Sequence, residues 1–206
     1  GIGLNYSDHA KETGLTPPNE PILFIKANSC ISGPNDNILI PKKSKKTDWE
    51  IELGIVIGKK TQYITEDKSF DHIFGYCLVN DVSEREFQIE KSGQWDMGKG
   101  CDTFGPIGPY LVTKDEIPDI QNLNLSLNLN GKTMQKGNTN KMIFDVRYIV
   151  SYLSRFMTLN TGDIITTGTP PGVGMASKPQ VFLKHGDKLT LTIDNLGTQT
   201  QKVISH

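Results

Sequence analysis

Three features that would point to particular functions are missing from this sequence: long apolar runs, an excess of one charge, and paired cysteines. No apolar segment approaches the ~18 residues of a membrane-spanning helix, and the start lacks the charged-then-apolar pattern of a signal peptide. Lysine and arginine number 22 against 23 acidic residues, a net charge of −1. We therefore expect no nucleic-acid partner and no membrane partner.

The three cysteines are far apart, odd in number and form no C-x-x-C pair: Cys30, Cys77 and Cys101. This pattern favours a reduced intracellular protein without structural disulfides, so we expect a cytoplasmic location, or a mitochondrial one if the chain is eukaryotic. No activating histidine lies near Cys101 in the sequence, and we interpret it as a buried, inert thiol.

The length of 206 residues suits one domain and is too short for two full ones. Glycine and proline, 20 and 11 residues, are spread along the chain, as in a loop-rich globular protein. We expect a single domain over residues 1–206. Because the chain opens on Gly1-Ile2-Gly3 without a methionine, we also expect that a preceding N-terminal segment is missing.

One strand-like stretch combines apolar and acidic side chains. Glu50 and Glu52 share one face of the predicted strand, and the opposite face is apolar: Trp49, Ile51 and Leu53. Two carboxylates on one face of a buried strand repel each other and resist desolvation unless a cation lies between them. Mg²⁺ or Mn²⁺ suits such oxygen ligands. An exposed edge strand with a solvated acidic face is the alternative that this motif leaves open.

A second apolar run, residues 73–79, leads to Asp81, and an acid at the end of a buried strand commonly presents a ligand at the rim of a pocket. Ser83 and Glu86 form a capping box that predicts the start of a helix. Arg85 would lie in its first turn, where it either holds an anionic substrate or pairs locally with Asp81.

The N-terminal region predicts a short helix with Asn5, Ser7 or Asp8 as its N-cap. On that helix His9 and Glu12 would share one face. A histidine held by a carboxylate is a good general base, whereas a surface pair without function is the alternative.

Residues 93–100 resemble a Walker A loop, but Gly100 replaces the serine or threonine that binds Mg²⁺. The prolines in residues 101–109 exclude the helix that a phosphate loop requires, so we exclude nucleotide binding. Lys99, between two glycines, is well placed to approach a ligand closely.

Further patterns predict the scaffold. Alternating leucines in residues 123–136 predict a hairpin with a type I′ turn at Asn130-Gly131. Helical spacing over residues 143–157, with Phe156 on the apolar face, predicts a helix that packs on the core. Additional strands are expected over residues 22–26 and, as a pair, over residues 188–204.

A further strand, beginning near Asp163, runs into a Gly/Pro-rich turn that ends at Gly174. Such a turn holds backbone N–H groups and the Thr169 hydroxyl in fixed positions, which are the parts of an anion or oxyanion site. A purely structural turn is the alternative.

Five motifs, in this order, resemble the fumarylacetoacetate hydrolase family: Asn5-Tyr6-x-Asp8-His9-x-x-Glu12, Asp48-Trp49-Glu50-x-Glu52-Leu53, Asn80-Asp81-x-x-x-Arg85, Gly98-Lys99-x-x-Asp102-Thr103-Phe104 and Gly168-Thr169-Pro170-Pro171-Gly172. The resemblance spans essentially the whole chain. The tract over residues 93–109 is most similar to the branch labelled 2,4-diketo-3-deoxy-L-fuconate hydrolase or ureidoglycolate lyase.

The resemblance implies a mainly β (α+β) fold, a mixed β-roll or sandwich with a few short helices, in a homodimer. It also implies Mg²⁺ or Mn²⁺, with Ca²⁺ as an alternative in crystals, on Glu50, Glu52 and Asp81. This favours the metal site over the edge strand.

With that resemblance we expect a hydrolase that cleaves a C–C bond in a small 2,4-dioxo acid, an acylpyruvate or a 2,4-diketo-3-deoxy sugar acid, and releases pyruvate. His9, oriented by Glu12, would activate water, and Lys99 would stabilise the oxyanion. The residues assigned to substrate binding are Arg85, Gln88 and Thr169. The alternatives are an oxaloacetate decarboxylase or a hydroxymuconate-type isomerase with the same metal-enolate chemistry, or a metal-binding module without catalysis.

Overall fold

The computed structural model describes residues 1–206. Its strands are β1 (Ile2–Gly3), β2 (Ile22–Leu23), β3 (Ile31–Ser32), β4 (Ile38–Ile40), β5 (Thr47–Asp48), β6 (Ile51–Ile57), β7 (Ile73–Asn80), β8 (Ser83–Glu84), β9 (Gly105–Pro106), β10 (Val112–Thr113), β11 (Asn124–Leu129), β12 (Lys132–Asn138), β13 (Ile164–Thr166), β14 (Lys188–Ile193) and β15 (Gly197–Ser205). Its α-helices are α1 (Ser7–Thr13), α2 (Ser69–His72), α3 (Asp96–Lys99) and α4 (Val146–Ser154). None of the helices has the length and apolar character needed to cross a membrane.

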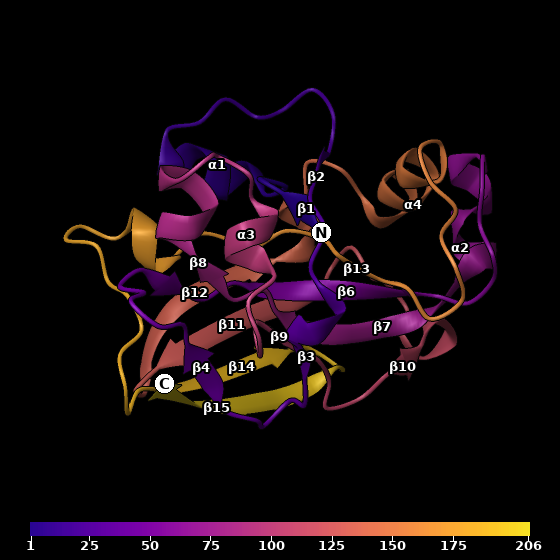
Figure 1. Cartoon of the computed structure of the whole chain (residues 1–206). Coiled ribbons are helices and arrows are strands. Elements are labelled where there is room, and N and C mark those ends of the chain that lie inside the picture. The colour runs from indigo at the N-terminus through magenta and orange to yellow at the C-terminus, as the bar shows by residue number, and fades with distance from the viewer.

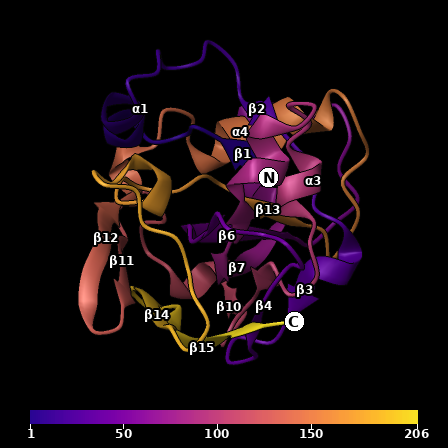
Figure 2. The same ribbon diagram turned by 60° about the vertical axis from the view of Figure 1, so that its left-hand side comes forward.

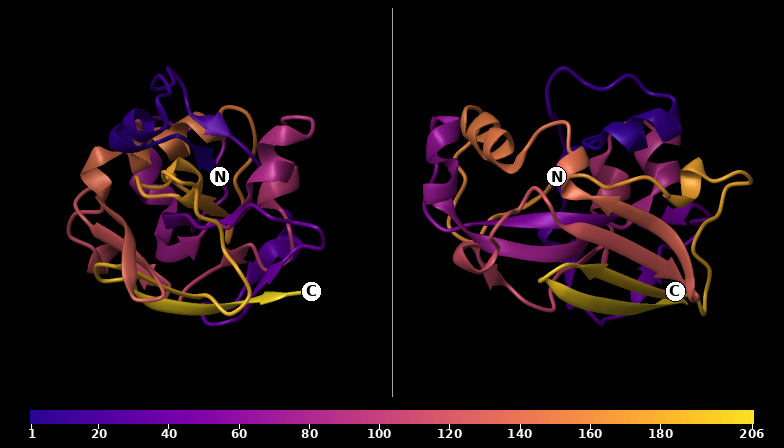
Figure 3. Two further views of the ribbon diagram at one scale, coloured as in Figure 1. Left: turned by 90° about the vertical axis from the view of Figure 1, so that its left-hand side faces the viewer. Right: turned by 180° about the vertical axis from the view of Figure 1, so that it is seen from behind.

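Two main sheets form the body of the molecule (Figure 1). One has the strand order β10-β7-β6-β13, and the other has the order β12-β11-β14-β15-β4. The second sheet lies below the first and curls up along one side through β11 and β12 (Figures 2 and 3). Because β4 pairs with β15 in parallel while the other pairs in this sheet are antiparallel, the sheet is mixed. The predicted mainly β fold with mixed sheets and short helices is confirmed.

The hydrophobic core fills the space between the two sheets. Its main cluster contains 32 buried residues, to which the inner faces of both sheets contribute. Leu53 and Leu78 come from the first sheet, and Leu127 and Leu191 come from the second. The alternation predicted for these strands therefore places their apolar side chains in the core, as expected for sheets packed face to face.

Helix α4 is shorter than the predicted range of 143–157. The Asp145 side chain accepts a hydrogen bond from the Tyr148 N–H at 2.8 Å, and this cap starts the helix at Val146. Phe156 lies beyond the last helical residue and is 64% exposed. Its assignment to the core-facing side of the helix is wrong, because the chain leaves the helix before reaching it.

Both predicted strand pairs near the C-terminal half are present. Strands β11 and β12 form the hairpin, and its turn residues Asn130 and Gly131 have φ values of 52° and 81°, which fits a type I′ turn. Strands β14 and β15 form the second pair. In contrast, the strand predicted over residues 22–26 is limited to the two residues of β2.

The capping box predicted at Ser83 and Glu86 does not form. The Ser83 hydroxyl donates to the Asp81 carbonyl at 3.0 Å, so it does not cap a helix. Ser83 and Glu84 instead form β8, which pairs with β5. A short π-helical segment, η3 (Glu86–Glu90), follows.

Helix α1 forms where it was predicted, but none of the three expected residues is its N-cap. Tyr6 occupies the cap position without a side-chain cap hydrogen bond. The Asn5 amide instead bonds the carbonyls of Phe144 and Thr167 at 3.0 and 2.8 Å. These bonds fix the start of α1 against the loop that precedes α4 and the turn that follows β13.

Candidate active site

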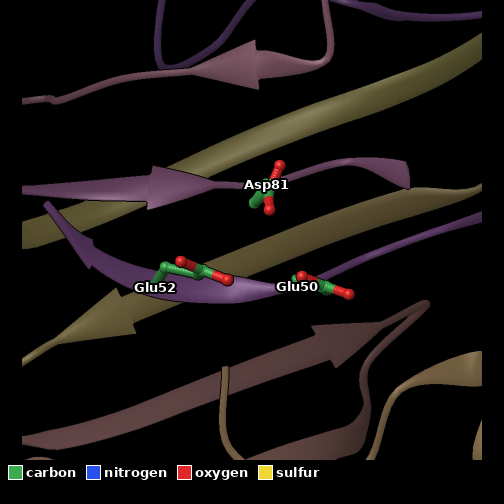
Figure 4. A group of neighbouring side chains, drawn as sticks. All are labelled: Glu50, Glu52 and Asp81. Atoms are coloured by element: carbon green, nitrogen blue, oxygen red, sulfur yellow. The ribbon is translucent and has the colours of Figure 1, made fainter. Parts of the chain in front are cut away.

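Three buried carboxylates meet where β6 and β7 lie side by side. Ile51 pairs with Asn80, and the Asp81 N–H donates to the Glu50 carbonyl at 2.8 Å. One oxygen of each of Glu50, Glu52 and Asp81 lies within 4.8 Å of the others, and Figure 4 shows the three side chains together. The structure thus brings the predicted metal ligands into one group. The edge-strand alternative is wrong, because β6 lies between β7 and β13.

Three cationic side chains surround two of these carboxylates. Lys99 Nζ donates to Glu50 Oε2 at 2.8 Å and to Asp81 Oδ2 at 2.7 Å. Lys26 Nζ donates to the other oxygen of Asp81 at 2.6 Å. Arg85 Nη1 lies 2.7 Å from Glu50 Oε1. The two carboxylates are therefore neutralised within the protein.

Glu52 has no cationic partner. Its Oε2 accepts the N–H of Gly168 at 2.7 Å, and the protein donates no hydrogen bond to Oε1. Burial, together with the charges of Asp81 and Glu50, raises the pKa of Glu52 well above its usual range. Burial also favours a raised pKa for Glu50, but the neighbouring cations outweigh burial and lower the pKa of Glu50. Lys99 makes the largest contribution among these cations. Glu52 is therefore the one carboxyl of the three that pairs with no cation of the protein, so it retains its proton more readily than the other two.

Arg85 is held by acids other than the one that the sequence suggested. Its Nε and Nη2 each lie 2.9 Å from Asp48 Oδ2, and Nη1 contacts Glu50. Nη1 also donates to Gln88 Oε1 at 3.0 Å. Arg85 therefore forms no local salt bridge with Asp81, and most of its five N–H donors are used within the protein.

His9 and Glu12 form a hydrogen-bonded pair on α1, with 3.1 Å between His9 Nδ1 and Glu12 Oε2. The carboxylate is fixed by the Gly172 N–H at 3.0 Å. Because a carboxylate only accepts, Nδ1 carries the proton and Nε2 is left with a free lone pair. His9 is 8% exposed, so the alternative of a functionless surface pair does not fit it.

Gln88 and Thr169 present donors in different ways. Since Gln88 Oε1 accepts from Arg85, its amide NH₂ group is the free end. The Thr169 hydroxyl donates to the Ile51 carbonyl at 2.9 Å and accepts from Gln135 at 2.8 Å. The hydroxyl is therefore not the free donor that the sequence predicted, whereas the Thr169 N–H forms no hydrogen bond within the protein.

These groups open into one cavity of about 150 Å³. Most of the predicted site residues line it: His9, Glu50, Glu52, Arg85, Gln88, Lys99 and Thr169. Glu12 and Asp81 reach the cavity only through their bonds to His9 and Lys99. The combination of a general-base pair, a lysine and a carboxylate group in one enclosed space is typical of an active site.

Comparison with known proteins agrees with this geometry. Residues 1–204 match the family described as fumarylacetoacetate (FAA) hydrolase C-terminal. The chain belongs to the fumarylacetoacetate hydrolase family. A protein of Burkholderia cenocepacia is 60% identical to this chain over 202 residues. The matched part covers 98% of this chain and 72% of that protein, whose name calls it a hydrolase and gives no substrate.

Solved structures of the fumarylacetoacetate hydrolase family have the same fold. The fumarylacetoacetate hydrolase of Exiguobacterium antarcticum is 39% identical, with a TM-score of 0.92 over 100% of this chain and 74% of that one. The 5-carboxymethyl-2-hydroxymuconate delta-isomerase of Mycobacterium smegmatis is 38% identical, with a TM-score of 0.88 over 100% and 77%. The family therefore includes proteins named for hydrolysis and for isomerisation.

The donor set of this family member fits a divalent cation. Members of the fumarylacetoacetate hydrolase family use such a metal, and carboxylate oxygens are the ligands that Mg²⁺ and Mn²⁺ prefer. In this chain Glu50, Glu52 and Asp81 would hold it. A cation would stabilise the ionised form of Glu52 and would satisfy its oxygen that accepts no hydrogen bond.

Two functional residues were missed by sequence reasoning. Asp48 shares the period-two face of Glu50 and Glu52, so the alternation could have identified it. It also accepts the N–H groups of Gly174 and Met175 at 2.7 and 3.0 Å, which ties the turn after β13 to the site. Lys26 had no such signal, because its contact with Asp81 joins residues 55 positions apart.

Cys101 is half-buried, and its thiol donates one hydrogen bond, to the Met97 carbonyl at 3.5 Å. Burial raises the pKa of the Cys101 thiol to about 11. A thiol with so raised a pKa is a poor nucleophile near neutral pH, which agrees with its interpretation as inert. All three cysteines are free.

Proposed function

We propose that this chain is the catalytic domain of a divalent-metal-dependent hydrolase that cleaves the C3–C4 bond of a 2,4-dioxo acid to release pyruvate. The single observation that carries the proposal is the shared cavity. The free Nε2 of His9 and the carboxylates of Glu50 and Glu52 belong to residues that line it together. A site that only bound a metal would have no need of the His9–Glu12 pair, whose histidine is buried.

Charge balance supports a carboxylate substrate. Ion pairs around the site join three buried acids, Asp48, Glu50 and Asp81, with three buried or half-buried cations, Lys26, Arg85 and Lys99. Glu52 is a fourth buried acid and takes part in no ion pair. Once Glu52 is ionised, as metal binding requires, the four acids and three cations have a net charge of −1. A divalent cation would change it to +1, and one substrate carboxylate would then neutralise the site.

When bound, the cation supplies a Lewis acid that polarises the oxygens of an α-keto acid. The remaining steps belong to residues of the chain. His9 Nε2 accepts a proton from a water molecule, and the resulting hydroxide attacks the C4 carbonyl. Glu12 keeps the imidazole in the required tautomer and stabilises its charged form.

Lys99 supplies positive charge where the oxyanion at C4 develops. Its ammonium is retained despite burial, because Asp81 and Glu50 raise the pKa of Lys99 and outweigh desolvation. The Gln88 amide and the Thr169 N–H are the free donors for the substrate carboxylate. Arg85 acts chiefly by orienting Gln88, with one N–H of its guanidinium left for substrate.

Collapse of the C4 adduct breaks the C3–C4 bond. The acyl group leaves as a carboxylic acid, and C3 leaves as the enolate of pyruvate. Protonation of that enolate at C3 completes pyruvate, with the imidazolium of His9 as the proton source. One water is consumed for each substrate cleaved, and no oxidant or reductant is needed.

A second candidate function is isomerisation of a hydroxymuconate-type diacid. The observation that favours it is the 38% identity to a protein named as an isomerase of this kind. Isomerisation or oxaloacetate decarboxylation would use the metal and a proton donor without attack by water. His9 would then move protons between carbon atoms.

Parallel assays with Mg²⁺ and Mn²⁺ separate these reactions. Acetylpyruvate, 2,4-diketo-3-deoxy-fuconate, oxaloacetate and a hydroxymuconate-type diacid are each followed with and without a chelator. Metal-dependent loss of 2,4-dioxo acid absorbance with formation of pyruvate supports the hydrolase. Turnover of the diacid alone would reject the hydrolase and support the isomerase. Turnover of none of these compounds would support a metal-binding module without catalysis.

The proposal also includes the cellular setting. The enzyme would act in the cytoplasm as a homodimer, in line with its three free cysteines and with its family. Sedimentation equilibrium over a range of protein concentrations tests the dimer, and a mass of a single chain at all concentrations would reject it.

A further inference from the structure

The walls of the active-site cavity differ from its floor. The buried end of the cavity, which we call its floor, is formed by charged and polar groups that include Glu50, Glu52 and Lys99. Of the 17 residues that line the whole cavity, 7 are hydrophobic. Three of these hydrophobic residues, Leu15, Ile89 and Met175, come from segments after α1, in η3 and in the turn η6 (Gly174–Ala176). A ligand that binds the floor therefore extends between apolar side chains.

Two of these apolar side chains are unusually exposed for residues that line a cavity. Leu15 is 56% exposed and Ile89 is 48% exposed. They belong to separate elements, the loop that follows α1 and the segment η3, which lie on the same side of the molecule (Figure 1). An apolar group between them would remove both side chains from water, and such burial is favourable in proportion to the area covered.

The cavity offers no cation for a second carboxylate. Its only lysine and arginine are Lys99 and Arg85, and both already contact acids of the floor. A carboxylate beyond the reacting carbons would meet Leu15 and Ile89 and lose hydration without gaining a partner. The cavity thus discriminates by charge as well as by shape.

From these observations, and resting on the function proposed above, we propose that the substrate is a monocarboxylic 2,4-dioxo acid with a short apolar acyl tail. Leu15 and Ile89 contact that tail and determine specificity against diacids. The proteins named as isomerases among the structural relatives carry acids with two or three carboxylates in their names. In this chain the second carboxylate of such a substrate is unfavourable.

Binding of substrate-like inhibitors tests the proposal without turnover. Oxamate, N-butyloxamate and N-(3-carboxypropyl)oxamate share one head group and differ in the tail. Each is titrated calorimetrically into the Mg²⁺-loaded protein. We expect affinity to rise roughly fourfold for each methylene that is buried, so that N-butyloxamate binds more than about tenfold tighter than oxamate. The acidic tail should bring no gain over oxamate.

A pair of matched variants locates the effect. Ile89→Lys places a cation beside the tail and should reverse the preference, so that the acidic tail binds tighter than the butyl tail. Met97→Lys is the control, because Met97 is also 48% exposed but does not line the cavity. It should leave all three affinities unchanged. Leu15→Ala should weaken the butyl compound and leave oxamate unaffected.

The outcomes separate this inference from the proposed reaction. Equal affinity for the butyl and acidic tails, or an unchanged preference in Ile89→Lys, overturns the specificity and leaves the reaction standing. Tail-dependent binding without hydrolysis of any acylpyruvate overturns the reaction and supports the specificity. Failure of oxamate to bind the Mg²⁺-loaded protein overturns both.

Discussion

The two faces of the stretch around β6 are equally buried and chemically opposite. Trp49, Ile51 and Leu53 are 0% exposed and belong to the core, whereas Glu50 and Glu52 are 7% and 1% exposed and belong to the site. Burial alone therefore does not distinguish scaffold from active site. The difference lies in what each face contacts.

On the apolar face, burial is favourable in itself. On the acidic face, burial is unfavourable, and the raised pKa of Glu52 records this cost. Contacts with Lys99 and Arg85 offset the cost for Glu50 alone. The acidic face is thus suited to bind a cation, and the apolar face holds it in place. Substitutions on the two faces should have separate effects.

Glu52→Gln should have the largest effect, loss of metal binding and of metal-dependent activity. The same change should not destabilise the metal-free chain. The pKa of Glu52 is higher in the folded chain than in the unfolded chain. Such a carboxyl destabilises the fold at every pH above its pKa in the unfolded chain, because ionisation is then more costly in the folded state. At pH 8 the amide should therefore raise the free energy of unfolding.

Calorimetric titration with Mn²⁺ and thermal unfolding without metal measure the two effects of Glu52→Gln. Glu66→Gln, in the exposed segment η2 (Glu66–Lys68), is the control. Retained Mn²⁺ affinity in Glu52→Gln would contradict the role of this face.

His9→Ala tests a group that borders the acidic face without belonging to it. The rate should fall by roughly 10²–10⁴, the usual contribution of a general base, while Mn²⁺ affinity stays unchanged. The ratio of kcat between variant and wild type at saturating metal measures this, with the exposed C-terminal His206→Ala as control. Full turnover by His9→Ala would show that His9 does not activate water.

Leu53→Ala tests the apolar face. Removing a fully buried leucine should lower the free energy of unfolding by about 2–5 kcal/mol, with Mn²⁺ affinity of the folded chain retained. Urea unfolding measures the loss, and Leu111→Ala, at a residue that is 50% exposed, should change stability by less than about 0.5 kcal/mol. A loss of Mn²⁺ affinity without a loss of stability would mean that the two faces are not separate.

Lys26→Met should have the smallest effect on the site. Lys26 fixes one oxygen of Asp81 and leaves the other directed at the site. Loss of this orienting contact should reduce kcat/KM by roughly 10–100-fold, as for other residues that orient metal ligands. Lys114→Met, remote from the site on the segment η4 (Lys114–Glu116), is the control. An unchanged kcat/KM would show that Asp81 needs no such support.

Much of the scaffold and of the site could be predicted because the signals are local. The hairpin at Asn130-Gly131 follows from the left-handed backbone that this turn requires. The His9–Glu12 contact follows from helical spacing, since residues three apart share a face. Sequence-based predictions failed where a polar side chain could form its hydrogen bond with more than one partner. The Ser83 hydroxyl bonds the Asp81 carbonyl instead of capping a helix.

The sequence by itself determined the alternation that puts the carboxylates of Glu50 and Glu52 on one face, because a strand has a period of two. Only the tertiary structure decided that Asp81 joins them and that Lys26, Lys99 and Arg85 neutralise two of the three acids but not Glu52. These contacts join residues far apart in the chain, and their energies depend on burial and geometry that exist only once the sheets have packed.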